Sequence, residues 1–129
     1  MLFRSMMHRR LGAIPPADAI ADVEESAERL TTELGEAPGW FAWPFGNVES
    51  ISPAVLSAIA SRFEFCCSGV RGLNTASTRR STIFRDAMDL AAPAEYSSLV
   101  VDGGLDPLYG SRRRRLGRMT AEIQAQSNG

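Results

Sequence analysis

Two short segments hold the residues best suited to form a site: the single histidine, His8, and an aromatic turn at residues 43–47. A neutral imidazole can bind a divalent cation or move a proton near neutral pH. One imidazole alone, however, does not make a metal site of useful affinity. A lone histidine is also commonly a surface or loop-packing residue, so both interpretations of His8 stay open.

The aromatic turn ends an apolar segment, residues 40–43, which contains both tryptophans of the chain. Because proline has no N–H and cannot continue a central ladder, we expect a buried strand followed by a loop over residues 44–47. Ligands bind at the carboxyl ends of strands in α/β proteins, and aromatic faces stack on sugar rings. A core strand with a tight turn explains the segment equally well. The candidate substrate-binding residues are Trp43, Pro44, Phe45 and Asn47.

Two charged clusters near the C-terminus are weaker candidates. Residues 102–106 contain two aspartates but lack the ligand spacing of an EF-hand, so a turn with Asp106 as N-cap before Pro107 explains them better. Arginines 112–115, with Arg118, could touch phosphate or an acidic polymer. Consecutive arginines fan around a helix, which favours a solvated terminal helix.

The hydrophobic pattern predicts alternating helices and strands. Apolar residues recur at steps of three and four over residues 17–34, which indicates an amphipathic helix that Gly35 ends. Ser52 and Pro53 are typical of a second helix N-terminus, and residues 63–68 predict another strand. This order predicts an α/β fold with a parallel sheet. The other expected elements are the end of a strand at Leu2 and Phe3, a short strand at 82–85, a helix at 107–119 and a frayed tail at 120–129.

Several of these segments also resemble a known family. Residues 41–46, Phe-Ala-Trp-Pro-Phe-Gly, are similar to a segment of the polysaccharide deacetylase family of carbohydrate esterases. The other similar segments are 5–11, 22–35 and, more loosely, 68–72 and 83–85. The resemblance implies the C-terminal part of a polysaccharide deacetylase domain, an incomplete (β/α) barrel over residues 1–119, before a disordered tail at 120–129.

The resemblance also implies a chemistry, the metal-dependent hydrolysis of N- or O-acetyl groups on a carbohydrate. His8 matches a ligand of the family's divalent metal, zinc by preference. The backbone N–H of Phe45 matches a donor to the tetrahedral oxyanion. Arg4 stands where the family has its other histidine ligand, and an arginine cannot ligate a cation. No histidine follows His8 to act as the family's late catalytic acid.

We therefore expect hydrolysis to be impaired in this chain and metal binding to be weak. The family's aspartate pair, which supplies the general base, would precede Met1. The alternative interpretation is a non-catalytic carbohydrate-binding remnant. A third interpretation, a polyanion-binding protein, would rest on the C-terminal arginines alone.

Length and composition limit the other function classes. The 129 residues suit one domain, and a net charge of −1 gives no field that favours nucleic acid or a membrane surface. No apolar run suggests a signal peptide or a membrane span, so the sequence predicts a cytoplasmic protein. An incomplete barrel would expose a parallel sheet edge, through which a homo-oligomer could form.

Overall fold

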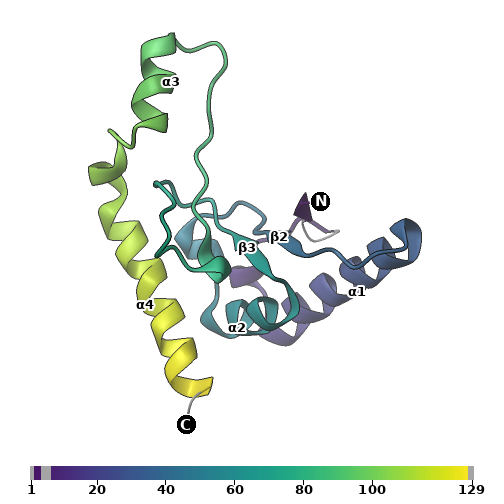
Figure 1. The fold of residues 1–129 in the computed structure, drawn as a ribbon. Coiled ribbons are helices and arrows are strands. Elements are labelled where there is room, and N and C mark those ends of the chain that lie inside the picture. Colours follow the sequence, from purple (N-terminus) through teal and green to yellow (C-terminus); the bar gives the residue numbers. More distant parts are fainter. Residues whose placement is uncertain (1, 4–6, 128–129) are drawn as a thin grey trace.

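The computed structural model describes residues 2–3 and 7–127 of the chain. A parallel sheet lies at its centre and contains β1 (Leu2–Phe3), β2 (Trp40–Ala42) and β3 (Phe65–Cys67) (Figure 1). The strand order is β1-β2-β3, with Trp40 paired with Leu2 on one side and with Phe65 on the other. The central strand is thus the aromatic segment.

Two helices connect these strands: α1 (Pro16–Leu34) precedes β2, and α2 (Pro53–Arg62) precedes β3. The helices pack against each other, and both lie along the same side of the sheet in Figure 1. Helix α1 ends at Gly35, whose left-handed φ of 77° turns the chain and lets its N–H donate to the Thr31 carbonyl. The predicted α/β class, with two parallel strands and two helices over residues 17–68, is confirmed.

The segment after β3 extends the sheet at one point. Ile83 forms a parallel bridge with Cys67, and its N–H donates to the Cys66 carbonyl over 2.9 Å. The Ile83 carbonyl in turn accepts from the Ser68 N–H over 2.8 Å. In place of the short strand predicted at 82–85, the structure has a single bridge at Ile83. Because of this bridge, the residues that follow Ile83 lie at the same sheet edge as the ends of β2 and β3.

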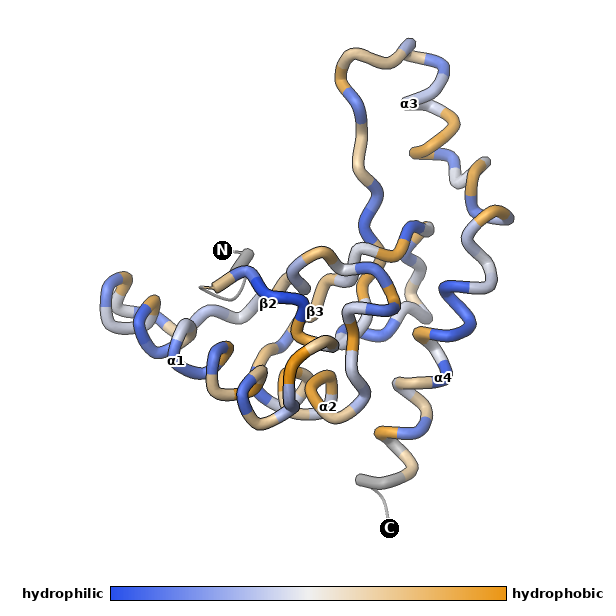
Figure 2. Tube along the Cα trace, turned by 180° about the vertical axis from the view of Figure 1, so that it is seen from behind, coloured by the Kyte–Doolittle hydropathy of each residue, from blue (hydrophilic) through white to orange (hydrophobic). Residues whose placement is uncertain are grey.

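The hydrophobic core lies between the sheet and the helices. Phe41 and Trp43 are two residues apart, so their side chains point to the same side of the chain, and both enter the core. Their ring centroids lie 5.6 Å apart in an edge-to-face arrangement. Helix α2 supplies Val55, Leu56 and Ile59, and Figure 2 shows hydrophobic residues along this helix in orange. This packing fixes the direction of β2, and with it the position of the turn that follows.

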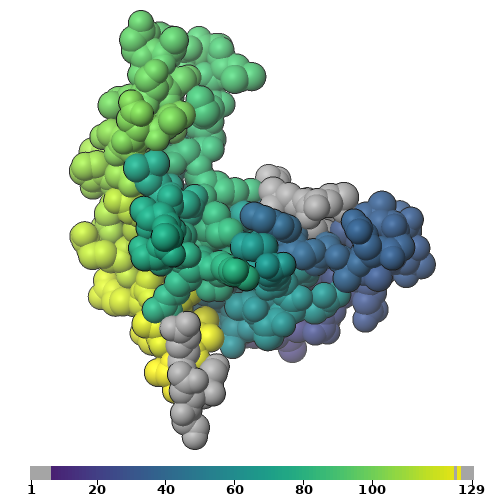
Figure 3. Space-filling view, in the orientation of Figure 1, coloured from purple at the N-terminus to yellow at the C-terminus, as the bar shows by residue number. Residues whose placement is uncertain are grey.

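The C-terminal third leaves the sheet and returns. Helix α3 (Ala94–Val101) projects from the body of the molecule, as Figures 1 and 3 show, and a 3-10 turn at Asp106–Tyr109 leads into α4 (Gly110–Ser127). Asp106 does not cap this turn as predicted. Its carboxylate accepts from the Leu73 N–H at 3.2 Å and pairs with Arg113 at 2.7 Å, which ties the projection to the loop after β3.

Helix α4 continues beyond its predicted end at Met119. Leu116 and Thr120 are buried, and Ile123 packs against the same core, so residues on one face hold the helix in place. The tail predicted for 120–129 is consequently helical as far as Ser127. No described helix is both long and apolar enough to cross a bilayer.

Burial of the Cys66 thiol in β3 makes the stability of the fold depend on pH. It is 0% exposed, and burial, with a smaller contribution from Cys67, raises the pKa of its thiol from 9.0 to about 12. Between these values the unfolded chain loses the proton and the folded chain keeps it, which favours unfolding. The contribution of Cys66 to stability is therefore complete below pH 9.0 and is lost as the pH rises towards 12.

We predict that the free energy of unfolding falls less between about pH 8 and about pH 10.5 in Cys66→Ala than in the unaltered protein. Denaturant unfolding at the two pH values measures the difference. Cys67→Ala is the matched control, because Arg85 opposes the rise in the Cys67 pKa and the effect should be smaller. An equal fall in all three proteins would contradict this account of the core.

Candidate functional site

Four segments meet at the carboxyl edge of the sheet. Since parallel strands all point the same way, the residues that follow them gather at one edge. They are residues 7–10 after β1, 44–47 after β2, 68–72 after β3 and 85–87 after the Ile83 bridge. The candidate site is built from these loops, and most of its functional groups come from the last three.

Phe45 occupies a strained turn at this edge. The Gly46 N–H donates to the Pro44 carbonyl over 2.7 Å, and Phe45 between them has a left-handed φ of 61°. A turn of this kind is rare, and strained backbone of this kind clusters at functional sites. Hydrogen bonds between described residues leave the Phe45 N–H without an acceptor. The turn thus presents a backbone donor and, with a residue exposure of 55%, an aromatic ring.

The turn after β1 meets this ring. The centroid of the His8 imidazole lies 5.1 Å from that of the Phe45 ring, and the guanidinium carbon of Arg10 lies 5.1 Å from the same centroid. The two candidates singled out in the sequence are therefore neighbours in space. His8 itself has a left-handed φ of 48° and an exposed side chain.

Two glycines join the loops after β2 and β3. The Gly69 N–H donates to the Gly46 carbonyl over 2.7 Å. A Cβ placed on Gly46 would lie only 2.4 Å from the Gly69 nitrogen, and one on Gly69 would lie 3.0 Å from the Gly46 backbone. Gly46 also has a φ of 67°, which favours glycine. A side chain at Gly46 would therefore prevent this approach, and one at Gly69 would make it tight.

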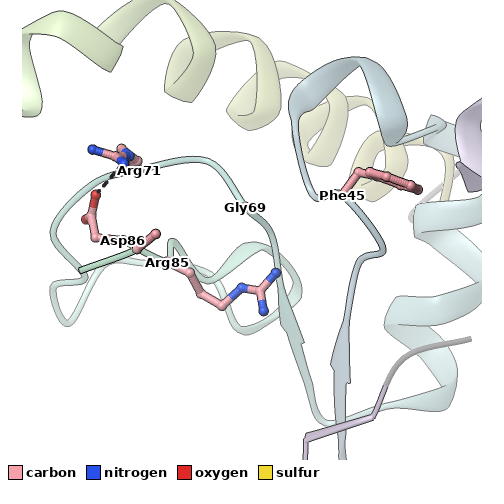
Figure 4. Close-up of a pocket in the computed structure, with 6 residues that line it drawn as sticks. Phe45, Gly69, Arg71, Arg85 and Asp86 are labelled. Atoms are coloured by element: carbon pink, nitrogen blue, oxygen red, sulfur yellow. Dashed lines mark ion pairs between the residues drawn. The ribbon is translucent and has the colours of Figure 1, made fainter. Parts of the chain in front are cut away.

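A cavity of about 310 Å³ opens beside the joined loops. It is lined by Phe45, Gly69, Arg71, Arg85, Asp86 and Ala87. Figure 4 shows the Arg71–Asp86 pair on one side and the Arg85 side chain extended towards the loop of Gly69. The Arg85 Nε donates to the Ser68 carbonyl over 2.6 Å, which fixes the direction of its guanidinium group.

Arg71 is held from several directions. Its Nη1 lies 3.4 Å from the hydroxyl of Tyr96 and 3.5 Å from that of Tyr109, and its Nε lies 3.8 Å from Asp86. The hydrogen bond with Tyr96 makes the largest contribution to raising the pKa of Arg71, so the group keeps its charge. The Gly72 N–H donates to the other oxygen of Asp86 over 3.2 Å. These contacts also anchor the α3 projection at the site.

The predicted substrate-binding residues differ in their positions. Trp43 is 1% exposed, and Pro44 is fully buried beside it, so both act in the core. The Asn47 amide donates to Glu49 and its carbonyl accepts from Ser50, which engages it in the local turn. Phe45 is thus the member of the predicted set that lines the cavity.

The residues present do not fit the metal that the family resemblance implies. The described residues contain no group of three His, Cys, Asp or Glu side chains that could hold an ion, and His8 contacts an aromatic ring and lies near arginine. Arg4, at the position of the family's other histidine, lies outside the described residues.

The sequence indicated the arginines of the cavity only in part. Arg71 begins a polar loop, residues 71–74, that a sugar contact and a simple turn explain equally well, whereas Arg85 stood out only as the last residue of a short predicted strand. Two of the C-terminal arginines are engaged within the chain, since Arg113 pairs with Asp106 and Arg115 with Glu49. Comparisons with protein-family models, curated proteins and solved structures found no match to this chain.

We predict that Gly46→Ala destabilises the protein by about 1–3 kcal/mol or more, because the new Cβ meets backbone atoms and the residue must keep a positive φ. Gly39→Ala is the matched control, as nothing lies within 4 Å of a Cβ at that position. It should change stability by less than about 0.5 kcal/mol. Thermal and urea unfolding measure both variants, and equal stability of the two would argue against the contact.

Proposed function

We propose that this chain is a polysaccharide deacetylase-like protein, corresponding to the C-terminal part of the family's (β/α) barrel, and that it binds an N-acetylated carbohydrate at the carboxyl edge of its sheet. The observation that carries the proposal is the 5.1 Å contact between His8 and Phe45. These residues belong to two segments that separately resemble the family, at positions 5–11 and 41–46. Their meeting at one strand edge supports a common site.

The chemistry of the edge suits a sugar. The exposed Phe45 ring offers an apolar face, and the cavity beside it carries polar groups that can hydrogen-bond hydroxyl and acetamide oxygens. The N–H of Phe45 is directed by a strained turn and is a donor suited to an acetamide oxygen or to the oxyanion that replaces it. Binding of the acetyl group is therefore the step that these residues favour.

The sequence lacks most of the groups that the family uses for hydrolysis. A zinc hydrolase normally takes three protein ligands and leaves one position for water. His8 is the only histidine, so neither a second imidazole ligand nor a late histidine acid is available in this sequence. We propose that the chain binds the carbohydrate and that its own residues turn it over poorly or not at all.

The binding proposal predicts that chitotetraose changes the tryptophan fluorescence of the protein. A Trp40→Phe variant leaves Trp43, directly before the turn, as the reporter. In that background Phe45→Ala should weaken binding about 10-fold or more, since the ring supplies the apolar contact. Leu34→Ala, which removes a side chain of similar exposure at the end of α1, should leave it unchanged. Equal affinities in the two variants would refute a role for Phe45.

The proposal on hydrolysis predicts less than one equivalent of bound zinc after dialysis and no acetate released from chitooligosaccharides. Metal analysis and an acetate assay on the same sample measure both quantities. His8→Ala should change neither result. One equivalent of zinc together with acetate release that His8→Ala abolishes would overturn it and would assign a complete site to other residues.

A further inference from the structure

The α3 projection, residues 86–108, exposes many apolar side chains. Figures 1 and 3 show it standing away from the sheet and from α1 and α2. Exposed apolar residues that gather in one part of a protein mark an interaction surface. Of the ten large apolar residues that are exposed in the described part of the chain, five lie in the projection: Met88, Leu90, Leu99, Val101 and Leu108.

The projection is also acidic, whereas the helix that follows it is basic. Residues 86–108 contain five carboxylates and no lysine or arginine, and α4 contains five arginines. The carboxylates that are exposed and have no ion pair within the described chain are Asp89, Glu95 and Asp102. The corresponding arginines are Arg112, Arg114 and Arg118. Unpaired charges of opposite sign therefore lie on two consecutive elements.

One side of α3 presents an apolar residue between two acids. Glu95, Leu99 and Asp102 are spaced four and three residues apart, so they lie on the same side of the helix. All three are exposed. On other sides of the helix Val100 is buried, and the Tyr96 hydroxyl reaches a guanidinium group of the cavity wall. These inward contacts fix which side of α3 faces outwards.

One side of α4 presents a small residue between two arginines. Arg114 and Arg118 lie one turn apart on an exposed side of the helix, and Gly117 lies beside them. A Cβ placed on Gly117 would have no atom within 4 Å apart from its own helix, so the surface is open there. An apolar side chain of a second helix can pack into such a gap while the arginines reach acids on either side.

The two sides do not meet within one chain. Asp106 anchors the base of the projection, because it pairs with Arg113 at 2.7 Å and accepts the Leu73 N–H. In Figure 1, α3 stands beyond the start of α4 and does not lie alongside it. A twofold axis near this base would place α3 of each copy antiparallel to α4 of the other. The lengths match, since α3 spans about 12 Å and residues 112–118 about 10 Å.

We propose that the chain forms a symmetric dimer in which the α3 projection of each copy packs against α4 of the other. The two acids on the outer side of α3 face the two arginines on the outer side of α4, and Leu99 packs at Gly117. Because the interface is isologous, each pair occurs twice, and the exposed apolar residues of both projections contribute to it. This surface is distinct from the sheet edge at β1.

Sedimentation equilibrium of the full chain tests for the dimer. We expect the average mass to rise towards twice that of the chain between about 1 μM and about 200 μM protein. Raising NaCl from about 50 mM to about 500 mM should weaken the dimer about 3-fold or more, because exposed charge pairs are screened. A monomer at every concentration overturns the proposal, and an affinity that salt leaves unchanged contradicts the charge pairing.

Two charge-reversed variants test the pairing itself. Glu95→Arg with Asp102→Arg makes the outer side of α3 basic, and Arg114→Glu with Arg118→Glu makes the outer side of α4 acidic. Each variant alone sets like charges against each other across the interface, so it should dimerise about 10-fold or more weakly. A mixture of the two variants has opposite charges at both contacts and should form a heterodimer of about the original affinity.

The matched control is Glu25→Arg with Glu28→Arg, which changes the net charge as the α3 variant does, at two exposed positions of α1. It should leave the dimer unchanged. Gly117→Gln adds a side chain where its own chain leaves space, so the fold should persist while the dimer weakens. Circular dichroism checks folding, and Gly117→Gln decides the question if a reversed variant is unfolded. A mixture of folded reversed variants that stays monomeric, or a dimer that neither reversal nor Gly117→Gln weakens, overturns the proposal.

Discussion

The approach of Gly46 to Gly69 is the contact on which the carboxyl edge depends. A hydrogen bond of 2.7 Å joins the two backbones, and any side chain at Gly46 would overlap Gly69. The loops after two adjacent strands are thereby held closer than ordinary residues permit. Every other group of the site is placed relative to this contact, because the flanking residues have little freedom once the two loops are joined.

Each loop contributes a different kind of group as a result. The loop after β2 is forced into a tight turn, which accounts for the left-handed φ of Phe45 and directs its ring outwards over His8. The loop after β3 places Arg71 where tyrosines from the α3 projection and the following 3-10 turn can reach it. The core behind the loops, with Phe41 and Trp43 packed edge to face, resists rearrangement of either strand.

The helices and the parallel order of β2 and β3 could be predicted because they follow from periodicity and from proline and glycine positions. The direction of Trp43 could not, since alternation along a strand identifies two faces without saying which one is buried. Trp43 lies in the core together with Phe41, whereas Trp40, on the opposite face of the strand, is 40% exposed. Arg85 was missed for a related reason: its position depends on one long-range bridge, Cys67 to Ile83, that no local pattern encodes.

The central claim is that an N-acetylated carbohydrate binds where these loops meet. Mapping of amide chemical shifts in the labelled protein during a titration with N-acetylglucosamine oligomers tests it most directly. The account predicts saturable shifts that are largest at Phe45, Gly46, Gly69 and Arg71. Shifts that are largest along the exposed face of α4, or that fail to saturate in a folded sample, would contradict it.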